Sequence, residues 1–145
     1  AWPMLRYRTR DIARLWNEPC PCGRTTRRMS RVAGRSDDML IIRGVNVFPS
    51  QIEEALLRVE GTTPHYLIEV DRPGTLDKVT VKVEIRPELF SDRMDRMQAL
   101  RERIAREIHT VAGIRAEVDL VELRSIERFA GKAKRVVDRR KLAEA

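Results

Sequence analysis

Long hydrophobic runs are missing from this 145-residue sequence. No apolar stretch approaches the roughly 18 residues that a membrane-spanning helix requires, and no secretory signal pattern opens the chain. The sequence therefore predicts a protein without a membrane segment, in a cytoplasmic location. Its content of hydrophobic residues, 42%, is nevertheless ordinary for a globular protein, and a chain of this length can bury one modest core.

Cysteines are equally scarce, because Cys20 and Cys22 are the only two in the sequence. One intervening residue is too short a spacing for an easy disulfide, and two thiolates make up only half of a four-ligand zinc site. His65 and His109 are distant from this pair in the sequence, and we assign them no role. We predict no metal site within the chain and interpret the pair as a reduced surface turn. Half of a metal site completed by another segment is the alternative.

Basic residues are in excess, and the net charge of +7 is concentrated in two stretches. Residues 23–36 contain five arginines and no acidic residue, while residues 124–141 contain eight basic and two acidic residues. Such stretches attract nucleic acid, membrane phosphate or a nucleotide, or they form a solvated basic face. Aromatic residues for base stacking are almost absent from both stretches, since Phe129 is the only one. A nucleic-acid-binding module is therefore the weaker interpretation.

The apolar pattern predicts an α+β fold. Alternating apolar residues predict strands over residues 66–70, 79–85 and 116–120, and the short run 39–42 is typical of a buried strand. Apolar residues at intervals of three and four predict two helices, the first with Ser50 and Glu53 as a capping box and Gly61 as its stop, the second over residues 94–111. This order favours a small, mostly antiparallel sheet with two helices packed on one face, preceded by a hinge hairpin and followed by a basic tail.

Three motifs carry the most specific signal. Residues 34–53 have the sequence GRSDDMLIIRGVNVFPSQIE; residues 7–11, YRTRD, precede them, and residues 131–135, GKAKR, follow. In this order the motifs resemble those of the C-terminal domain of adenylate-forming enzymes, the superfamily of acyl-CoA synthetases, peptide-synthetase adenylation domains and luciferase. The wording RGVNVFP is similar to that of the phenylacetate–CoA ligase branch.

The resemblance implies a division of the chain and an activity. Residues 1–34 would be a connector from an N-terminal adenylation domain outside this chain, containing the end of the nucleotide site and the hinge entry, and residues 35–145 would be a mobile C-terminal domain. The complete protein would be an acid–CoA ligase that uses ATP, Mg2+ and coenzyme A to activate a small carboxylic acid, with an aryl acid such as phenylacetate as the default. A relative that adenylates an acid without coenzyme A, as in coenzyme F390 synthesis, is the alternative.

The chain by itself is expected to be inactive. Its seven glycines are scattered singly, so it has no glycine-rich phosphate loop, and the acyl pocket would belong to the other domain. The expected partners are that N-terminal domain and the acid substrate, with neither nucleic acid nor membrane. Self-association into a homo-oligomer stays open.

The resemblance also implies roles for five residues. Asp11 would accept hydrogen bonds from the ribose hydroxyls of ATP, and Arg35 would also reach the nucleotide. Asp37 would be the hinge about which the C-terminal domain swings. Gly44 would let the backbone pass close to the pantetheine arm of coenzyme A. Lys132 would reach the substrate carboxylate and the α-phosphate.

The chemistry of these residue types suits the roles. A carboxylate only accepts hydrogen bonds and so suits a diol, and a lysine between a carboxylate and a phosphate offsets their repulsion. Each residue also has an ordinary alternative: a turn cap, a solvated base or a strand end. The sequence alone does not distinguish Asp37 from the neighbouring Asp38 as the hinge residue. Ala130 stands where the lysine motif usually has Ser or Thr, and Lys134 is close by, so the assignment of Lys132 depends on the register of the motif.

Overall fold

The computed structural model describes residues 5–86, 94–128 and 135–140. The chain separates into two compact units, residues 1–39 and residues 40–145. The predicted boundary after residue 34 lies slightly earlier than this division and stays a prediction. In the described part of the chain, no helix has both the length and the apolar character needed to cross a membrane.

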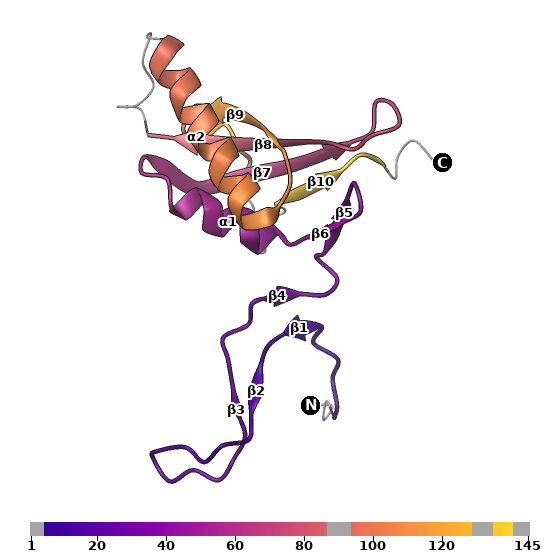
Figure 1. Cartoon of the computed structure of the whole chain (residues 1–145), viewed down its shortest axis with the longest axis vertical. Coiled ribbons are helices and arrows are strands. Elements are labelled where there is room, and N and C mark those ends of the chain that lie inside the picture. Colours follow the sequence, from indigo (N-terminus) through magenta and orange to yellow (C-terminus); the bar gives the residue numbers. More distant parts are fainter. Residues whose placement is uncertain (1–4, 87–93, 129–134, 141–145) are drawn as a thin grey trace. The chain divides into compact units, whose positions relative to one another are not determined.

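The first unit is one long hairpin, labelled β1 to β4 in Figure 1. β1 (Asp11–Ile12) pairs antiparallel with β4 (Gly34–Arg35), and β2 (Leu15–Trp16) pairs antiparallel with β3 (Arg28–Met29). Backbone hydrogen bonds from Ser30 to Arg14 and from Ala33 to Ile12 connect the two pairings. The hairpin that we predicted before the α+β unit is therefore present, and its tip contains the two cysteines.

The second unit is built on a four-stranded sheet with the strand order β10-β7-β8-β9. β7 (Thr62–Asp71) and β8 (Lys78–Ile85) form the predicted antiparallel hairpin. β9 (Glu117–Val121) runs parallel to β8, because the helix α2 between them carries the chain back along the sheet. β10 (Val136–Asp138) runs parallel to β7 and lies within the segment predicted only as a basic tail. Two of the three pairings in this sheet are therefore parallel. Antiparallel pairings predominate, at four of six among the described strands, once the pairings β1–β4, β2–β3 and β5–β6 are included.

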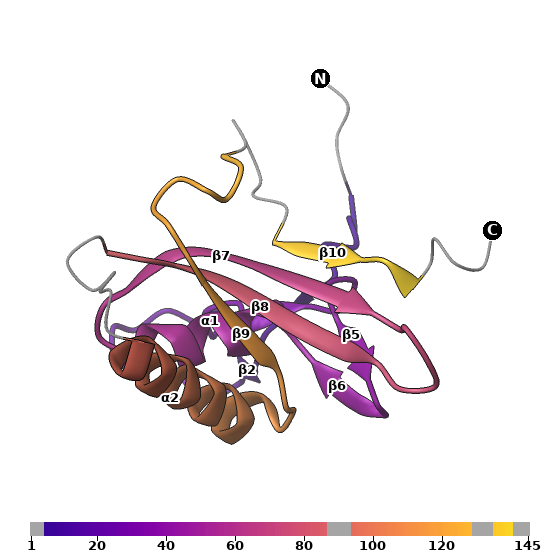
Figure 2. The same ribbon diagram turned by 90° about the horizontal axis from the view of Figure 1, so that it is seen from above.

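The two predicted helices lie on the same face of this sheet, as Figure 2 shows. α1 (Pro49–Leu57) and α2 (Met94–Ala112) direct Ile52, Leu56, Ile104 and Ile108 into the core. The short hairpin of β5 (Leu40–Ile42) and β6 (Val45–Val47) contributes Ile42 and Val47 to the same core. The α+β fold and its layers are therefore as predicted.

The start of α1 differs from the prediction. The helix begins at Pro49 and its N-cap is Phe48, whose backbone N–H donates to Oε1 of Gln51 at 2.9 Å. Proline is favoured at the first helical position because its fixed φ already suits the helix. The capping box expected from Ser50 and Glu53 is therefore wrong. The predicted stop is also displaced, because the helix ends at Leu57.

Candidate functional site

Asp11 and Arg35 are brought together in the first unit, although they lie far apart in the sequence. They are direct partners in the antiparallel pairing of β1 with β4. Residues opposite each other in such a pair have Cβ atoms about 4.5–5.5 Å apart and project from the same side of the ladder. The two residues that the resemblance assigns to the nucleotide are thus neighbours across one strand pair.

Asp37 is held by arginines. Arg35 binds its carboxylate at two points, with Nε to Oδ1 at 3.1 Å and Nη2 to Oδ2 at 2.8 Å, and Nη1 of Arg10 lies 3.9 Å from Oδ2. Such two-point binding fixes the orientation of a carboxylate as well as its position. Asp38 instead donates its backbone N–H to the carbonyl of Arg35 at 3.2 Å. The structure therefore distinguishes the two aspartates that the sequence left equivalent.

The two cysteines are free thiols in a tight turn at the tip of the first unit. Their Sγ atoms lie 3.0 Å apart, and the Gly23 N–H donates to the Cys20 carbonyl. Hydrogen bonds from Cys22 lower the pKa of the Cys20 thiol below its usual value. No cluster of three or more His, Cys, Asp or Glu suited to a metal occurs among the described residues. The half-site alternative is not tested by this result, because its remaining ligands would come from another segment.

Gly44 lies in the two-residue turn between β5 and β6. Both turn residues have positive φ, +49° at Arg43 and +81° at Gly44, while Ile42 and Val45 are paired on either side. This is the pattern of a type I′ turn, which matches the twist of the flanking strands. Glycine adopts such a φ readily, but a residue with a side chain loses about 1–2 kcal/mol there. A Cβ atom on Gly44 would meet open space, so the glycine is required by the backbone and leaves the turn accessible.

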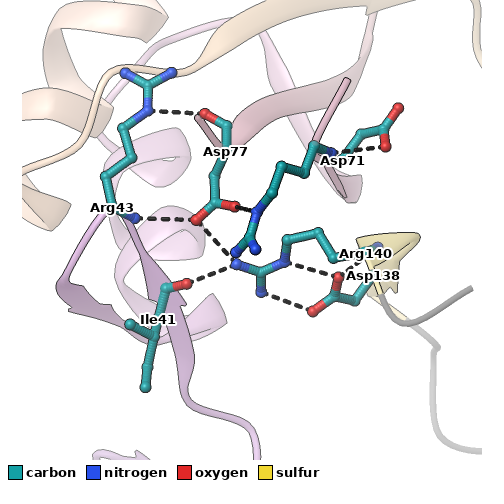
Figure 3. A network of polar contacts seen from close by, with 7 residues as sticks. Ile41, Arg43, Asp71, Asp77, Asp138 and Arg140 are labelled. Atoms are coloured by element: carbon teal, nitrogen blue, oxygen red, sulfur yellow. Dashed lines mark hydrogen bonds and ion pairs between the residues drawn. The ribbon is translucent and has the colours of Figure 1, made fainter. Parts of the chain in front are cut away.

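Asp77 connects this turn to the sheet (Figure 3). Its Oδ2 accepts the Arg43 backbone N–H at 3.1 Å and Nη1 of Arg140 at 3.0 Å, and its Oδ1 accepts Nε of Arg72 at 2.9 Å. The Asp77 carbonyl accepts Nε of Arg43 at 2.8 Å. Asp77 is only 5% exposed, so the turn contacts a buried and fully engaged carboxylate.

Arg140, which lies two residues after the end of β10, joins the same network. It donates Nε and Nη2 to the two carboxylate oxygens of Asp138 at 3.0 and 2.7 Å, and Nη1 to the Ile41 carbonyl at 2.8 Å. Hydrogen bonding to Asp138 raises the pKa of Arg140. Burial alone would raise the pKa of Asp77, but the Arg43 N–H and the two arginine side chains outweigh it and lower that pKa to about 2. Asp77 and Arg140 are therefore both charged throughout the physiological range.

Arg135 is the last residue of the lysine motif, and it is bound to other residues of the second unit. Its guanidinium forms an ion pair with Glu53, donates to the Tyr66 hydroxyl at 3.0 Å and lies 4.9 Å from the centre of that ring. Its carbonyl accepts the Ile68 N–H at 2.9 Å. Burial and then the charge of Glu53 raise the pKa of Tyr66 to about 12. The arginine of the motif thus has a structural role, while Lys132 lies outside the described residues.

Glu84 fixes the segment that follows β9. It is completely buried, and its carboxylate accepts the Ile126 N–H at 2.9 Å and Nη2 of Arg128 at 2.6 Å. Burial opposes its ionisation, but these donors and the Arg124 N–H lower its pKa. Glu84 occupies a polar position in the apolar alternation of β8, which on a half-buried strand would expose it, but residues 126–128 contact it and it is buried.

The sequence reasoning missed Asp77, Glu84, Tyr66 and Arg140. No motif marks them, since each gains its role from a contact with a distant segment. The one signal available for Glu84 was its place between Val83 and Ile85 in a strand with regularly alternating apolar residues. For Asp77 it was a carboxylate at the end of the turn over residues 72–77, directly before the alternation of β8.

The second unit has a fold that recurs in acid–CoA ligases of known structure. A 2-hydroxyisobutyryl-CoA ligase, crystallised in its postadenylation state with R3-HIB-AMP, matches with a TM-score of 0.78 at 34% identity, over 94% of this chain and 29% of that one. A crystallised domain of phenylacetate-coenzyme A ligase from Bacteroides vulgatus matches with a TM-score of 0.64 at 38% identity, over 72% of this chain and 94% of that domain. The fold and the turn therefore define a small C-terminal domain of an adenylate-forming enzyme.

The family follows from the sequence match. Residues 44–140 match the family described as the AMP-binding enzyme C-terminal domain, and the chain belongs to it. It is also similar to the phenylacetate-coenzyme A ligase of Aromatoleum evansii, with 50% identity over 97% of this chain and 32% of that protein. The chain spans about a third of the length of the curated relatives it matches.

Proposed function

We propose that the chain is the mobile C-terminal domain of an AMP-forming carboxylic acid–CoA ligase that acts in the cytoplasm. Residues 1–34 would connect it to an N-terminal adenylation domain, and residues 35–145 would move. Its 50% identity to a phenylacetate-coenzyme A ligase supports an aryl acid such as phenylacetate as substrate, with ATP, Mg2+ and coenzyme A. The observation that carries the proposal is the first hairpin, which sets Asp11 opposite Arg35 while Arg35 holds Asp37.

The first half-reaction would join the acid to AMP. A carboxylate oxygen attacks the α-phosphorus of ATP, the bond from that phosphorus to pyrophosphate breaks, and an acyl-adenylate forms. Asp11 would accept hydrogen bonds from the ribose hydroxyls, and Arg35 would donate to the nucleotide. Lys132 would lie between the two anions and offset both their repulsion and the charge that develops at phosphorus.

The second half-reaction would transfer the acyl group. The coenzyme A thiol loses its proton and attacks the acyl carbonyl carbon, and AMP leaves. Rotation of the domain about Asp37 would withdraw Lys132 and present the Arg43–Gly44 turn beside the pantetheine arm. The exposed turn, with open space above Gly44, supports this role.

An assay of the complete protein tests the proposal. With ATP, Mg2+, phenylacetate and coenzyme A it should release AMP and pyrophosphate and form phenylacetyl-CoA. Pyrophosphate exchange into ATP should depend on the acid and proceed without coenzyme A. Exchange without any thioester product would instead favour the relative that adenylates an acid and does not use coenzyme A. Absence of both exchange and thioester with a panel of aryl acids would contradict the proposal.

A further inference from the structure

We propose that Asp77, supported by Arg140, is a positioning residue that holds the Arg43–Gly44 turn in the shape needed for coenzyme A. This inference rests on the proposed function, which places that turn beside the pantetheine arm. It assigns a role to a buried carboxylate and an arginine that no motif includes.

The turn needs external support because Arg43 is in a left-handed conformation. Its φ of +49° is unfavourable for a residue with a side chain, and such conformations persist where surrounding contacts determine them. Asp77 supplies two such contacts, one from its carboxylate to the Arg43 backbone N–H and one from its carbonyl to Nε of Arg43. The backbone and the side chain of Arg43 are therefore both hydrogen-bonded to Asp77.

Arg140 makes the support rigid. Its Nη1 binds both the Ile41 carbonyl, two residues before Arg43, and Oδ2 of Asp77. Its other nitrogens bind Asp138 in β10, which is itself paired with β7. The β5–β6 hairpin is thus tied to the sheet at two neighbouring points by one charged network (Figure 3).

The placement of this network favours a role at the turn over a role in the core. Arg43 and Gly44 are exposed, whereas Asp77 beneath them is buried. The β5–β6 hairpin also contributes Ile42 and Val47 to the core, so its attachment to the unit does not depend on Asp77 alone. Asp77 acts on the part of the hairpin that lies beyond the core, where the backbone shape matters to a ligand and not to packing.

The test compares the two half-reactions in the complete ligase carrying Asp77→Asn. The variant keeps the size of the side chain and removes its charge and one acceptor. We expect the KM for coenzyme A to rise roughly 10-fold to 100-fold, since small displacements of a binding element have effects of that order. Acid-dependent pyrophosphate exchange should stay within about 2-fold of the wild type, because that step does not use the turn.

A second test variant and a control variant complete the experiment. Arg140→Lys keeps the charge but cannot bind Ile41, Asp77 and Asp138 together, and it should also raise the KM for coenzyme A. Glu69→Gln is the matched control. Like Asp77, Glu69 lies on the β7–β8 hairpin, and its partly buried carboxylate forms ion pairs with Lys82 and Arg139. Its KM for coenzyme A should stay at the wild-type value.

Amide hydrogen exchange of residues 40–47 separates this inference from the proposed function. Hydrogen exchange at the Arg43 amide should be faster in Asp77→Asn than in the wild type and unchanged in Glu69→Gln. This result does not depend on whether coenzyme A accepts the acyl group. An unchanged KM for coenzyme A in an enzyme that forms the thioester would overturn the inference, and so would an equal loss of both half-reactions. If no thioester forms even in the wild type, the proposed function fails, and unaltered exchange at Arg43 would then also overturn the role of Asp77.

Discussion

Asp77 and Glu84 are the buried charged residues in the described core, and both lie on the β7–β8 hairpin. Each compensates for the loss of water with several donors, as a buried carboxylate must. Asp77 receives its donors from the β5–β6 turn, from Arg72 and from Arg140, which follows β10, whereas Glu84 receives them from residues 126–128. Ionised carboxylates thus attach two separate surface segments to one rigid hairpin.

The low pKa of Asp77 predicts a pH dependence of stability. Its folded pKa of about 2 lies below the ordinary value of 3.8. The contribution of Asp77 is therefore fully present above about pH 4 and is lost as the pH falls through about 2. Urea unfolding followed by circular dichroism should give Asp77→Asn a free energy of unfolding about 2 kcal/mol below the wild type at neutral pH. This difference should shrink between pH 4 and pH 2, and a constant difference would count against the assignment.

At the scale of elements, regular patterns were predictable and contacts between distant segments were not. The helix α2 and the β7–β8 hairpin follow from apolar spacing because one face of each covers the core. The alternation along β8 failed at Glu84 because neighbouring chain covers both faces of a central strand. The cap of α1 failed because Pro49 starts the helix before Ser50.

The candidate site was likewise predictable from the sequence only in part. The motif made Asp11, Arg35, Asp37 and Gly44 candidates, but the sequence contained no sign that Asp11 faces Arg35 or that Arg35 holds Asp37. Those contacts depend on the register of a hairpin with a long tip. The support of the turn by Asp77 depends on tertiary packing and was equally out of reach.

Glu84 gives a prediction at this scale, because it attaches the segment after β9 to the sheet. Replacement by Ala leaves Arg128 and the Ile126 N–H without their acceptor, and we expect the free energy of unfolding to fall by about 3–5 kcal/mol. The Ile126 amide should also exchange faster. Glu117→Ala is the control: Glu117 forms an exposed ion pair with Lys78, and exposed pairs contribute about 1 kcal/mol or less. Equal losses in the two variants would show that Glu84 has no special role.

At the scale of the whole molecule, the chain consists of a hairpin unit, residues 1–39, and an α+β unit, residues 40–145. Asp37 and its partner Arg35 lie just before this division in the sequence, which agrees with the proposed hinge at Asp37. The two segments to which we assign functions in the proposal, the Arg43–Gly44 turn and the lysine motif over residues 131–135, both belong to the second unit. Under the proposed function, movement of that unit would bring the lysine motif to the nucleotide in the first half-reaction and the Arg43–Gly44 turn to the pantetheine arm of coenzyme A in the second.

The most direct test of this account measures both half-reactions in the complete protein carrying Lys132→Ala. Formation of the acyl-adenylate should fall by roughly 10²–10³-fold, as expected for loss of one pre-aligned charge. Conversion of supplied acyl-adenylate and coenzyme A to thioester should continue near the wild-type rate, because the lysine is withdrawn in that step. An equal loss of both activities would contradict the claim that one mobile domain serves the two reactions with different segments.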